Sequence, residues 1–339
     1  MLPCPIVQAR IHSGKLYPLR FSPVLRDYTW GGRGFETRLG RLLPPGVTAE
    51  SWEISGHPDG LTRVFSGPLA GTTLPQLQRR FGPALVGRQS ATALAADRFP
   101  LLIKLLDAAD WLSVQVHPDD SWAIAHEGDS GKTEMWIVLH AEPGAQLIQG
   151  FRRGVDRDLF AAAVREGRGE EGLHRVAVET GDVFFLRPGT IHAIGPGLLL
   201  AEIQQSSNVT YRVYDWNRGD PDRPLHLAAA LEVLDFEITE PGPVIPELVA
   251  EQGLSLERLA VCPHFETCRL HLTDSRRWSG SCDGATFEIW AALAGSATLR
   301  WSRGSETLTA VEWILLPADL GDFEIVAEES ATLVRVRTP

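Results

Sequence analysis

The chain has 339 residues, of which 44% are hydrophobic, so it can fill the cores of two domains of ordinary size. Its formal charge of −11 at pH 7 disfavours binding to nucleic acid or to an anionic membrane. We therefore expect neither kind of partner. An anionic ligand would have to be attracted by a local cluster of cations.

We expect neither a membrane span nor a signal peptide in this sequence. No apolar run reaches the roughly 18 residues of a membrane span, and the N-terminal stretch MLPCPIVQARIHSGK lacks the apolar segment of a signal peptide. The four cysteines, Cys4, Cys262, Cys268 and Cys282, form no CxxC pair, which favours reduced thiols. These observations predict a cytoplasmic protein.

The N-terminal part, residues 17–56, consists of short apolar and polar alternations separated by Gly and Pro, as in a β-meander. Within it, Trp30-Gly31-Gly32 is interpreted as a plain turn packed by an aromatic ring, in preference to a backbone approach to a ligand. Glu50 and Glu53 flank Trp52 and could act on a proton or a metal, although such acids more often hold an arginine. Residues 72–98 then change to helical spacing.

The stretch LSVQVHPDDSWAIAHEGDSGKTE, residues 112–134, carries most of the candidate chemistry. If LSVQVHP is a strand, Ser113, Gln115 and His117 share one face and the two valines share the other. The preceding run FPLLIKLLDA has the composition of a buried strand. We therefore expect the polar face to line a cavity.

After this stretch, TEMWIVLHAEPGAQLIQG indicates two strands, residues 155–167 indicate an amphipathic helix, and further strands bring His192 just beyond a Pro-Gly turn. A helix at about 224–236 ends the first domain. The predicted organisation is a catalytic domain over residues 1–240, a Pro-rich linker over 241–257 and a second β domain over 258–339.

The second β domain resembles a shortened copy of the first. FFLRPG, at 184–189, can be aligned with ILLPA, at 314–318, as a closing strand and turn. In this alignment His192 falls opposite Gly321, and no pair like Gln115 and His117 precedes it. If there is a second barrel, it has no metal site.

Four residues are candidates for one metal site: Gln115, His117, Glu134 and His192. Two imidazoles, a carboxylate and an amide oxygen suit Zn²⁺ or a similar divalent ion and leave room for water. Either histidine alone is better explained by a hydrogen bond to the backbone, but the combination favours the metal.

Three cations are candidates for holding an anionic substrate or stabilising negative charge on oxygen. Lys132 is two residues before Glu134, and Arg212 could reach the same cavity mouth. Lys104 lies inside an apolar run, so it extends to solvent, pairs with an acid or faces the cavity. Together they could hold an anionic substrate and stabilise negative charge that develops on oxygen.

Six motifs in the same order resemble the type I mannose-6-phosphate isomerases in their shorter bacterial form, from about Tyr17 to the C-terminus: YTWGG, AESWEISGHPDG, FPLLIKLLDAADWLSVQVHPDD, GKTEMW, GDVFFLRPGTIHAIGPG and EIQQSSNVTYRVYDW. The resemblance implies a mainly β cupin fold. It would have a metal-bearing double-stranded β-helix barrel with helical decoration and a metal-free C-terminal cupin-like domain. It also implies one zinc per chain, held at Gln115, His117, Glu134 and His192.

The resemblance further assigns Arg212 and Lys132 to catalysis and places Ser113 and Lys104 in the substrate pocket near the phosphate. It implies interconversion of mannose 6-phosphate and fructose 6-phosphate by proton transfer between C1 and C2 through an enediolate. The base remains open among Lys132, an acid such as Glu202 in the same pocket, and a hydroxide on the metal. Ile137 and Gly131 differ from the residues usual in the family, which leaves the preferred sugar open.

Two other functions are compatible with the same residues. One is a sugar-binding or regulatory cupin without catalysis, and the other is an isomerase of a different or unphosphorylated sugar. The sequence does not distinguish a monomer from a weak dimer.

Overall fold

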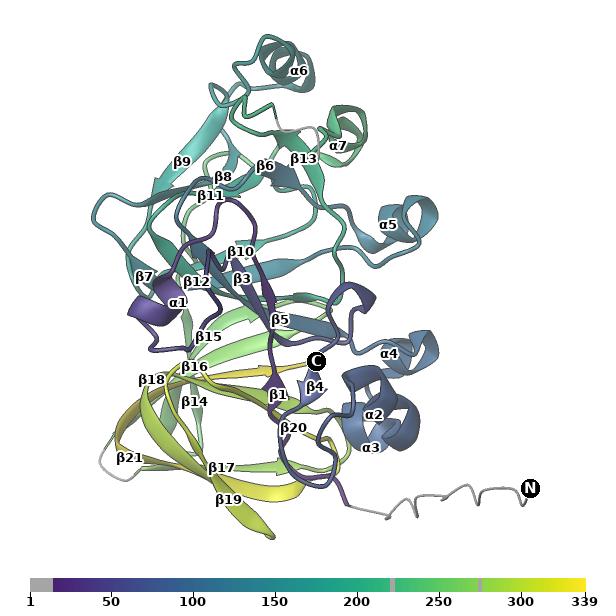
Figure 1. The fold of residues 1–339 in the computed structure, drawn as a ribbon, viewed down its shortest axis with the longest axis vertical. Helices are drawn as coiled ribbons and strands as arrows, with labels where there is room; N and C mark the ends of the chain where they lie inside the picture. Colours follow the sequence, from purple (N-terminus) through teal and green to yellow (C-terminus); the bar gives the residue numbers. More distant parts are fainter. Residues whose placement is uncertain (1–14, 220–222, 274–275) are drawn as a thin grey trace, which may run out of the picture.

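The computed structural model describes residues 15–219, 223–273 and 276–339, so Cys4 lies outside the described residues. Two β-rich regions are stacked along the long axis of the molecule, the first with most of the helices and the second formed by the C-terminal strands (Figure 1). In the described part of the chain no helix is long and apolar enough to span a membrane. Cys262, Cys268 and Cys282 are unpaired thiols.

The first region is a barrel of two antiparallel sheets, which is the cupin arrangement expected. One sheet consists, in spatial order, of β10 (Val183–Leu186), β7 (Glu134–Ala141), β12 (Leu198–Gln205), β5 (Leu101–Ala108), β3 (Glu50–Ile54) and β2 (Val24–Arg26). The other consists of β13 (Tyr211–Tyr214), β6 (Val114–Val116), β11 (His192–Ile194), β8 (Gln146–Phe151) and β9 (Leu173–Ala177). A small separate sheet pairs β1 (Phe21–Ser22) with β4 (Arg63–Val64).

Strand β5 shows why this sheet is apolar on both faces. Leu101, Ile103 and Leu105 point to the core shared with the second region, whereas Leu106 and Ala108 belong to the core inside the barrel. Every residue of β5 is buried, as the run FPLLIKLLDA predicted. The same alternation directs Lys104 into the barrel.

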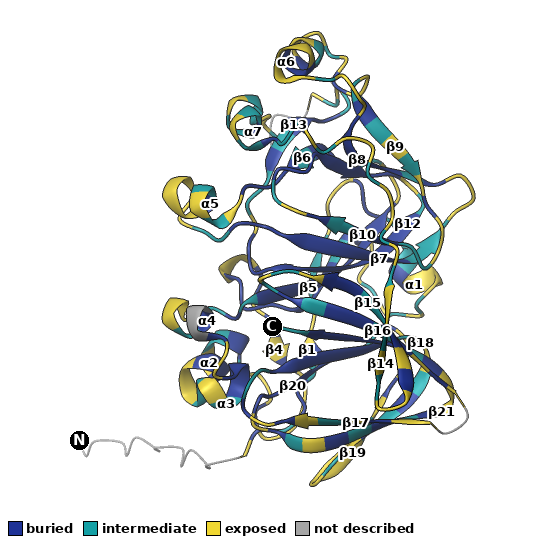
Figure 2. Ribbon diagram, turned by 180° about the vertical axis from the view of Figure 1, so that it is seen from behind, coloured by how far each residue is buried: buried dark blue, intermediate teal, exposed yellow. Residues whose placement is uncertain are grey.

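Helices cover the outside of the first region. Two of them, α6 (Arg157–Arg165) and α7 (Leu227–Val233), pack Phe160 and Ala230 into the apolar core on the outer face of the five-stranded sheet. The remaining helices are α1 (Gly34–Thr37), η1 (Pro58–Gly60), α2 (Leu74–Phe81), α3 (Pro83–Val86), α4 (Ala91–Ala96) and α5 (Asp120–His126). Figure 2 shows that α5 and α6 expose their outer sides, while the strands between the layers are buried.

The second region is one large antiparallel sheet curled around its own core. Its strands are β14 (Glu247–Glu251), β15 (Leu254–Val261), β16 (Glu266–Thr273), β21 (Gly321–Arg337), β18 (Glu288–Trp301) and β19 (Gly304–Leu308), with β17 (Arg277–Cys282) paired to β21 and β20 (Trp313–Leu316) paired to β18. Its outer face shares one continuous core with the first region, in which Leu105 and Ile203 join Ile289 and Val334. The partition at 1–240 and 258–339 into domains remains a prediction.

One expectation about the connection was wrong. The segment 241–257, expected to be a linker, contains β14 and the start of β15, which pair as a hairpin. Gln252 and Gly253 form its two-residue turn with φ of 54° and 73°, as a type I′ hairpin turn requires. The strand was not predicted because prolines precede it and its apolar residues are partly exposed, so it lacks the pattern of a buried strand.

Candidate metal centre and sugar-phosphate pocket

Three buried side chains converge inside the first barrel: His117, Glu134 and His192, whose ligand atoms all lie within 4.8 Å of one another. His117 follows β6 directly, Glu134 is the first residue of β7, and His192 is the first residue of β11. The register pairs His192 with Gln115 across β11 and β6. Strand ends from both sheets therefore bring the four predicted ligands together.

Hydrogen bonds orient both imidazoles. Nδ1 of His117 lies 2.8 Å from the Val209 carbonyl oxygen, and Nδ1 of His192 lies 2.9 Å from that of Thr190. Because a carbonyl only accepts, each Nδ1 donates, which leaves each Nε2 with a lone pair facing Glu134. Burial lowers the pKa of His117 well below its usual value and that of His192 to about 3, so both rings are neutral, as metal ligands must be.

The carboxylate between the imidazoles fits a bound cation. Oε1 of Glu134 is buried without a hydrogen-bond partner and lies 3.4 Å from Nε2 of His192, while Oε2 lies 3.7 Å from Nε2 of His117. Burial raises the pKa of Glu134, an effect that the charge of Lys132 opposes. The Gln115 amide lies 3.1 Å from Nε2 of His192, and a half-turn of this amide would present its oxygen instead. This donor set fits a divalent ion.

A network of two lysines and three carboxylates adjoins the centre. Nζ of Lys132 lies 2.7 Å from Oε2 of Glu134 and 3.9 Å from Oε1 of Glu202. Nζ of Lys104 lies 3.4 Å from Glu202 and 3.6 Å from Glu50. Burial acts against ionisation of Glu202, but Lys132 and Lys104 lower its pKa below the usual value. Lys104 thus both pairs with acids and faces the cavity.

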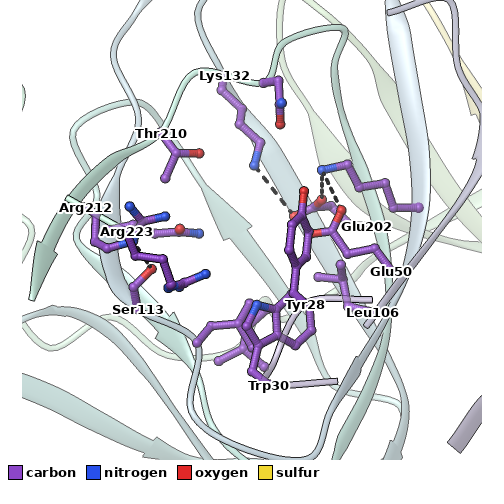
Figure 3. A pocket seen from close by; sticks show the side chains of 15 residues that line it. Tyr28, Trp30, Glu50, Leu106, Ser113, Lys132, Glu202, Thr210, Arg212 and Arg223 are labelled. Atoms are coloured by element: carbon purple, nitrogen blue, oxygen red, sulfur yellow. Dashed lines mark hydrogen bonds and ion pairs between the residues drawn. The ribbon is translucent and has the colours of Figure 1, made fainter. Parts of the chain in front are cut away.

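Two arginines lie on the opposite side of the pocket. Arg212, in β13, donates from Nε to Ser113 Oγ at 3.3 Å and from Nη1 to the Pro224 carbonyl at 3.0 Å. Arg223 donates from Nε to Asp215 Oδ2 at 3.1 Å. Figure 3 shows Arg212, Arg223 and Ser113 together on one side and Glu50 with Glu202 on the other.

These groups surround a cavity of about 290 Å³. Six of the predicted site residues line it directly: Lys104, Ser113, Gln115, Lys132, Glu202 and Arg212. The other three, His117, Glu134 and His192, lie behind Lys132 and Gln115. All the predicted residues therefore meet in one place.

Sequence reasoning did not single out several residues of the cavity wall, namely Tyr28, Thr210, Asn208 and Arg223. Trp30 also lines it, although Trp30-Gly31-Gly32 had been interpreted as a plain turn. Gly31 is needed because a Cβ there would come within 2.6 Å of the Ala49 backbone. The position of Glu50 beside Trp52 in a predicted strand was the only indication in the sequence that Glu50 could belong to the site. Its neighbour Glu53 instead holds Arg41 at 2.6 Å.

Comparisons with known proteins agree with this geometry. Residues 19–134 match the family described as phosphomannose isomerase type I, catalytic domain. A mannose-6-phosphate isomerase of Streptococcus mutans is 34% identical over 322 residues, which cover 92% of this chain and 98% of that protein. The chain belongs to the type I phosphomannose isomerases.

Further relatives of this family support the assignment over more than nine tenths of the chain. A probable mannose-6-phosphate isomerase of Bacillus subtilis is 40% identical over 313 residues, covering 91% of this chain and 96% of that protein. The crystal structure of a mannose 6-phosphate isomerase from Bacillus subtilis superposes with a TM-score of 0.83 at 31% identity, covering 94% and 99% of the two chains. The isomerase fold therefore includes the C-terminal β region.

Proposed function

We propose that the protein interconverts mannose 6-phosphate and fructose 6-phosphate in a zinc-dependent reaction. The observation that carries the proposal is the convergence of two neutral imidazoles and a buried carboxylate beside Lys132, at the inner end of a cavity with four cationic side chains in its wall. The identity of the substrate is proposed from the relatives that are named mannose-6-phosphate isomerases.

Gln115, His117, Glu134 and His192 would hold the ion, one per chain. Imidazole nitrogens with carboxylate and amide oxygens suit Zn²⁺, and other divalent metals could replace it. When bound there, the ion supplies positive charge that stabilises negative charge developing on the substrate oxygens. The remaining chemistry belongs to the protein's own side chains.

The reaction moves one proton from C2 of the open-chain aldose and adds one to C1, while a hydroxyl proton passes from O2 to O1. We assign the carbon proton to Lys132, whose Nζ lies 3.2 Å from Nε2 of His117 and lines the cavity at its metal end. Glu202 is the competing base. It is fixed by the hydrogen bond that it accepts from Nε1 of Trp136 at 3.0 Å, and we assign it, with Lys104, to the sugar hydroxyls.

Arg212 would stabilise the enediolate. Its backbone is paired with Gln115, so its strand adjoins the metal ligands, and its guanidinium is held by Ser113. Ser113 would in turn contact the substrate. Because these donors are fixed before the substrate arrives, they stabilise the developing charge without reorganising.

A coupled assay with a panel of sugars tests the proposal. The metal-loaded protein is expected to convert mannose 6-phosphate, to lose turnover on treatment with a chelator, and to regain it with Zn²⁺. Binding of mannose 6-phosphate without conversion would instead identify a sugar-binding cupin. Faster conversion of a different sugar phosphate or of an unphosphorylated sugar would contradict the assignment of mannose 6-phosphate as the substrate. Turnover that survives in Lys132→Met but not in Glu202→Gln would move the base to Glu202.

A further inference from the structure

The pocket has two chemically different walls. On one side, Lys104 and Lys132 contact the carboxylates of Glu50, Glu134 and Glu202 at 2.7–3.9 Å. A phosphate dianion placed there would face these carboxylates as well as the two ammonium groups. The opposite wall therefore offers a better place for a phosphate.

The opposite wall carries guanidinium and hydroxyl groups. Arg223 is only 15% exposed and is fixed by Asp215, which is 8% exposed and does not line the cavity. The contacts to Asp215 use Nε and Nη2 of Arg223, at 3.1 and 3.4 Å, and Nη1 takes no part in them. Asp215 thus orients the guanidinium from behind.

Ser113 and Arg212 lie close to this guanidinium. The Pro224 carbonyl that accepts from Arg212 immediately follows Arg223 in the chain, and Arg212 also donates to Ser113. Figure 3 shows both guanidinium groups beside the Ser113 hydroxyl. A planar guanidinium suits phosphate because it can donate two parallel hydrogen bonds.

The spacing along the strand separates this wall from the metal centre. Ser113, Gln115 and His117 follow one another on one face, so steps of about 3.3 Å per residue place Ser113 about 13 Å from His117 along the backbone. An open-chain hexose 6-phosphate carries its phosphate at the end opposite to C1 and C2. With C1 and C2 beside Lys132, the phosphate extends toward Ser113 and Arg223.

We propose that Arg223, oriented by Asp215, binds the substrate phosphate and makes the pocket selective for phosphorylated sugars. The inference rests on the proposed function for the identity of the substrate, but the binding of a phosphate group is its own claim. It assigns the phosphate to the arginine wall and leaves Lys104 to the sugar hydroxyls. Arg212 lies between the two ends, because its backbone pairs with Gln115 and its Nε donates to Ser113, and it keeps the role of stabilising the enediolate.

The test compares Arg223→Gln with Arg218→Gln in the metal-loaded full chain. Arg218 is a matched control because it also contacts Asp215, at 3.1 Å, but does not line the cavity. The measurements are KM and kcat for mannose 6-phosphate and competitive inhibition by inorganic phosphate, with melting temperatures as a folding check. Arg223→Lys, which keeps the charge but loses the paired donors, is measured in parallel.

In Arg223→Gln, KM and the inhibition constant of phosphate are expected to rise by about 10- to 100-fold, since this is the range for one charge-assisted contact. Here kcat should change much less, Arg223→Lys should lie between, and Arg218→Gln should match the wild type. If Arg223→Gln does not fold, the intermediate rise in Arg223→Lys decides. Phosphate inhibition unchanged by both Arg223 variants, or changed equally by Arg218→Gln, overturns the proposal. A wild type that binds phosphate through Arg223 but does not convert mannose 6-phosphate would contradict only the proposed function.

Discussion

In the first β region, β7 begins at Glu134 and pairs with β10, where Glu134 lies opposite Leu186. In the second, β18 begins at Glu288 and pairs with β20, where Glu288 lies opposite Leu316. The sequences EMW and EIW start the two strands. Glu288 is therefore the counterpart of a proposed metal ligand.

The strands that pair with the other edges of β7 and β18 carry opposite charges at equivalent positions. Trp136 of β7 lies opposite Glu202 of β12, whereas Trp290 of β18 lies opposite Arg335 of β21. Nε1 of Trp290 donates to Glu288 at 2.6 Å. Burial raises the pKa of Glu288, and the charge of Arg335 opposes that effect. The second barrel thus balances its carboxylate with a guanidinium.

The histidines have no counterpart. Gly321 pairs with Cys282 as His192 pairs with Gln115, which agrees with the alignment of His192 to Gly321. The second interior is filled by apolar side chains such as Trp278 and Phe323. Within the described residues, His117, Glu134 and His192 are the only cluster of three or more His, Cys, Asp or Glu side chains placed to hold a metal ion. The cupin fold thus supplies equivalent positions in both barrels, and a few side chains decide whether those positions hold a metal.

Loss of a proposed metal ligand should have the largest effect, because it removes the metal site that distinguishes the first barrel from the second. His192→Ala should lower the metal content from about one ion per chain to near zero and abolish turnover, because the site loses an imidazole already oriented by Thr190. Metal analysis and the coupled assay measure both. The control is His271→Ala, an exposed histidine of strand β16 in the second region, which should keep metal and turnover. Full metal content in His192→Ala would place the metal elsewhere.

The next effect concerns Arg212. Arg212→Lys should lower kcat by about 10²- to 10³-fold with little change in KM, because the donors that stabilise the transition state are misplaced while the charge remains. Steady-state kinetics with mannose 6-phosphate give the two constants. This pattern is the reverse of that expected for Arg223→Gln. An equal rise of KM in Arg212→Lys and Arg223→Gln would show that both arginines serve substrate binding.

A smaller effect is expected at Asp129, in the segment that leads to Lys132. Oδ2 of Asp129 lies 3.2 Å from Nε2 of His57, Oδ1 accepts from the Ser130 amide at 2.8 Å, and Arg98 forms an ion pair with the same carboxylate. Asp129→Asn should lower kcat by about tenfold through displacement of Lys132. It should also lower the melting temperature by about 2–4 °C, the effect of roughly 1 kcal/mol.

The stability effect of Asp129 has a defined pH dependence. Burial tends to raise its pKa, but the hydrogen bonds from His57 and Ser130 and the pairing with Arg98 lower it below the usual value. The stabilisation is therefore complete above the unfolded pKa of about 3.9 and is lost as pH falls toward the lower folded value. Melting curves of wild type and Asp129→Asn should converge below about pH 4. A difference that grows on acidification would contradict this assignment.

The smallest effect on activity is expected for Glu288→Gln. The amide oxygen can still accept from Trp290, so the variant should fold, with turnover and metal content equal to the wild type. It is the matched control for Glu134→Gln, which should lose metal. A loss of metal in Glu288→Gln would mean that the second barrel also takes part in metal binding.

Much of the first barrel could be predicted because its signals are local. The alternation of Ser113, Gln115 and His117 placed a polar face inward, and the buried run around Lys104 predicted a central strand. His192 was a candidate because it follows a Pro-Gly turn, and the match to the isomerase motifs supported it, but no local pattern could show that it pairs with Gln115.

The remaining features depend on contacts between distant segments. Arg223 gave no signal, since its place in the pocket depends on Asp215 and on the return of the chain along β13. Glu288 was overlooked because EIW is a short match until the register of β18 with β20 is known. The hairpin at Gln252 was hidden because Pro residues precede a strand that is mostly exposed.

Metal stoichiometry measured together with turnover of mannose 6-phosphate tests the central claim most directly. The account predicts one divalent ion per chain, parallel loss of ion and turnover on dialysis against a chelator, and parallel recovery with Zn²⁺. Turnover that persists after the ion has been removed, or two ions bound per chain, would contradict a single metal centre in the first barrel.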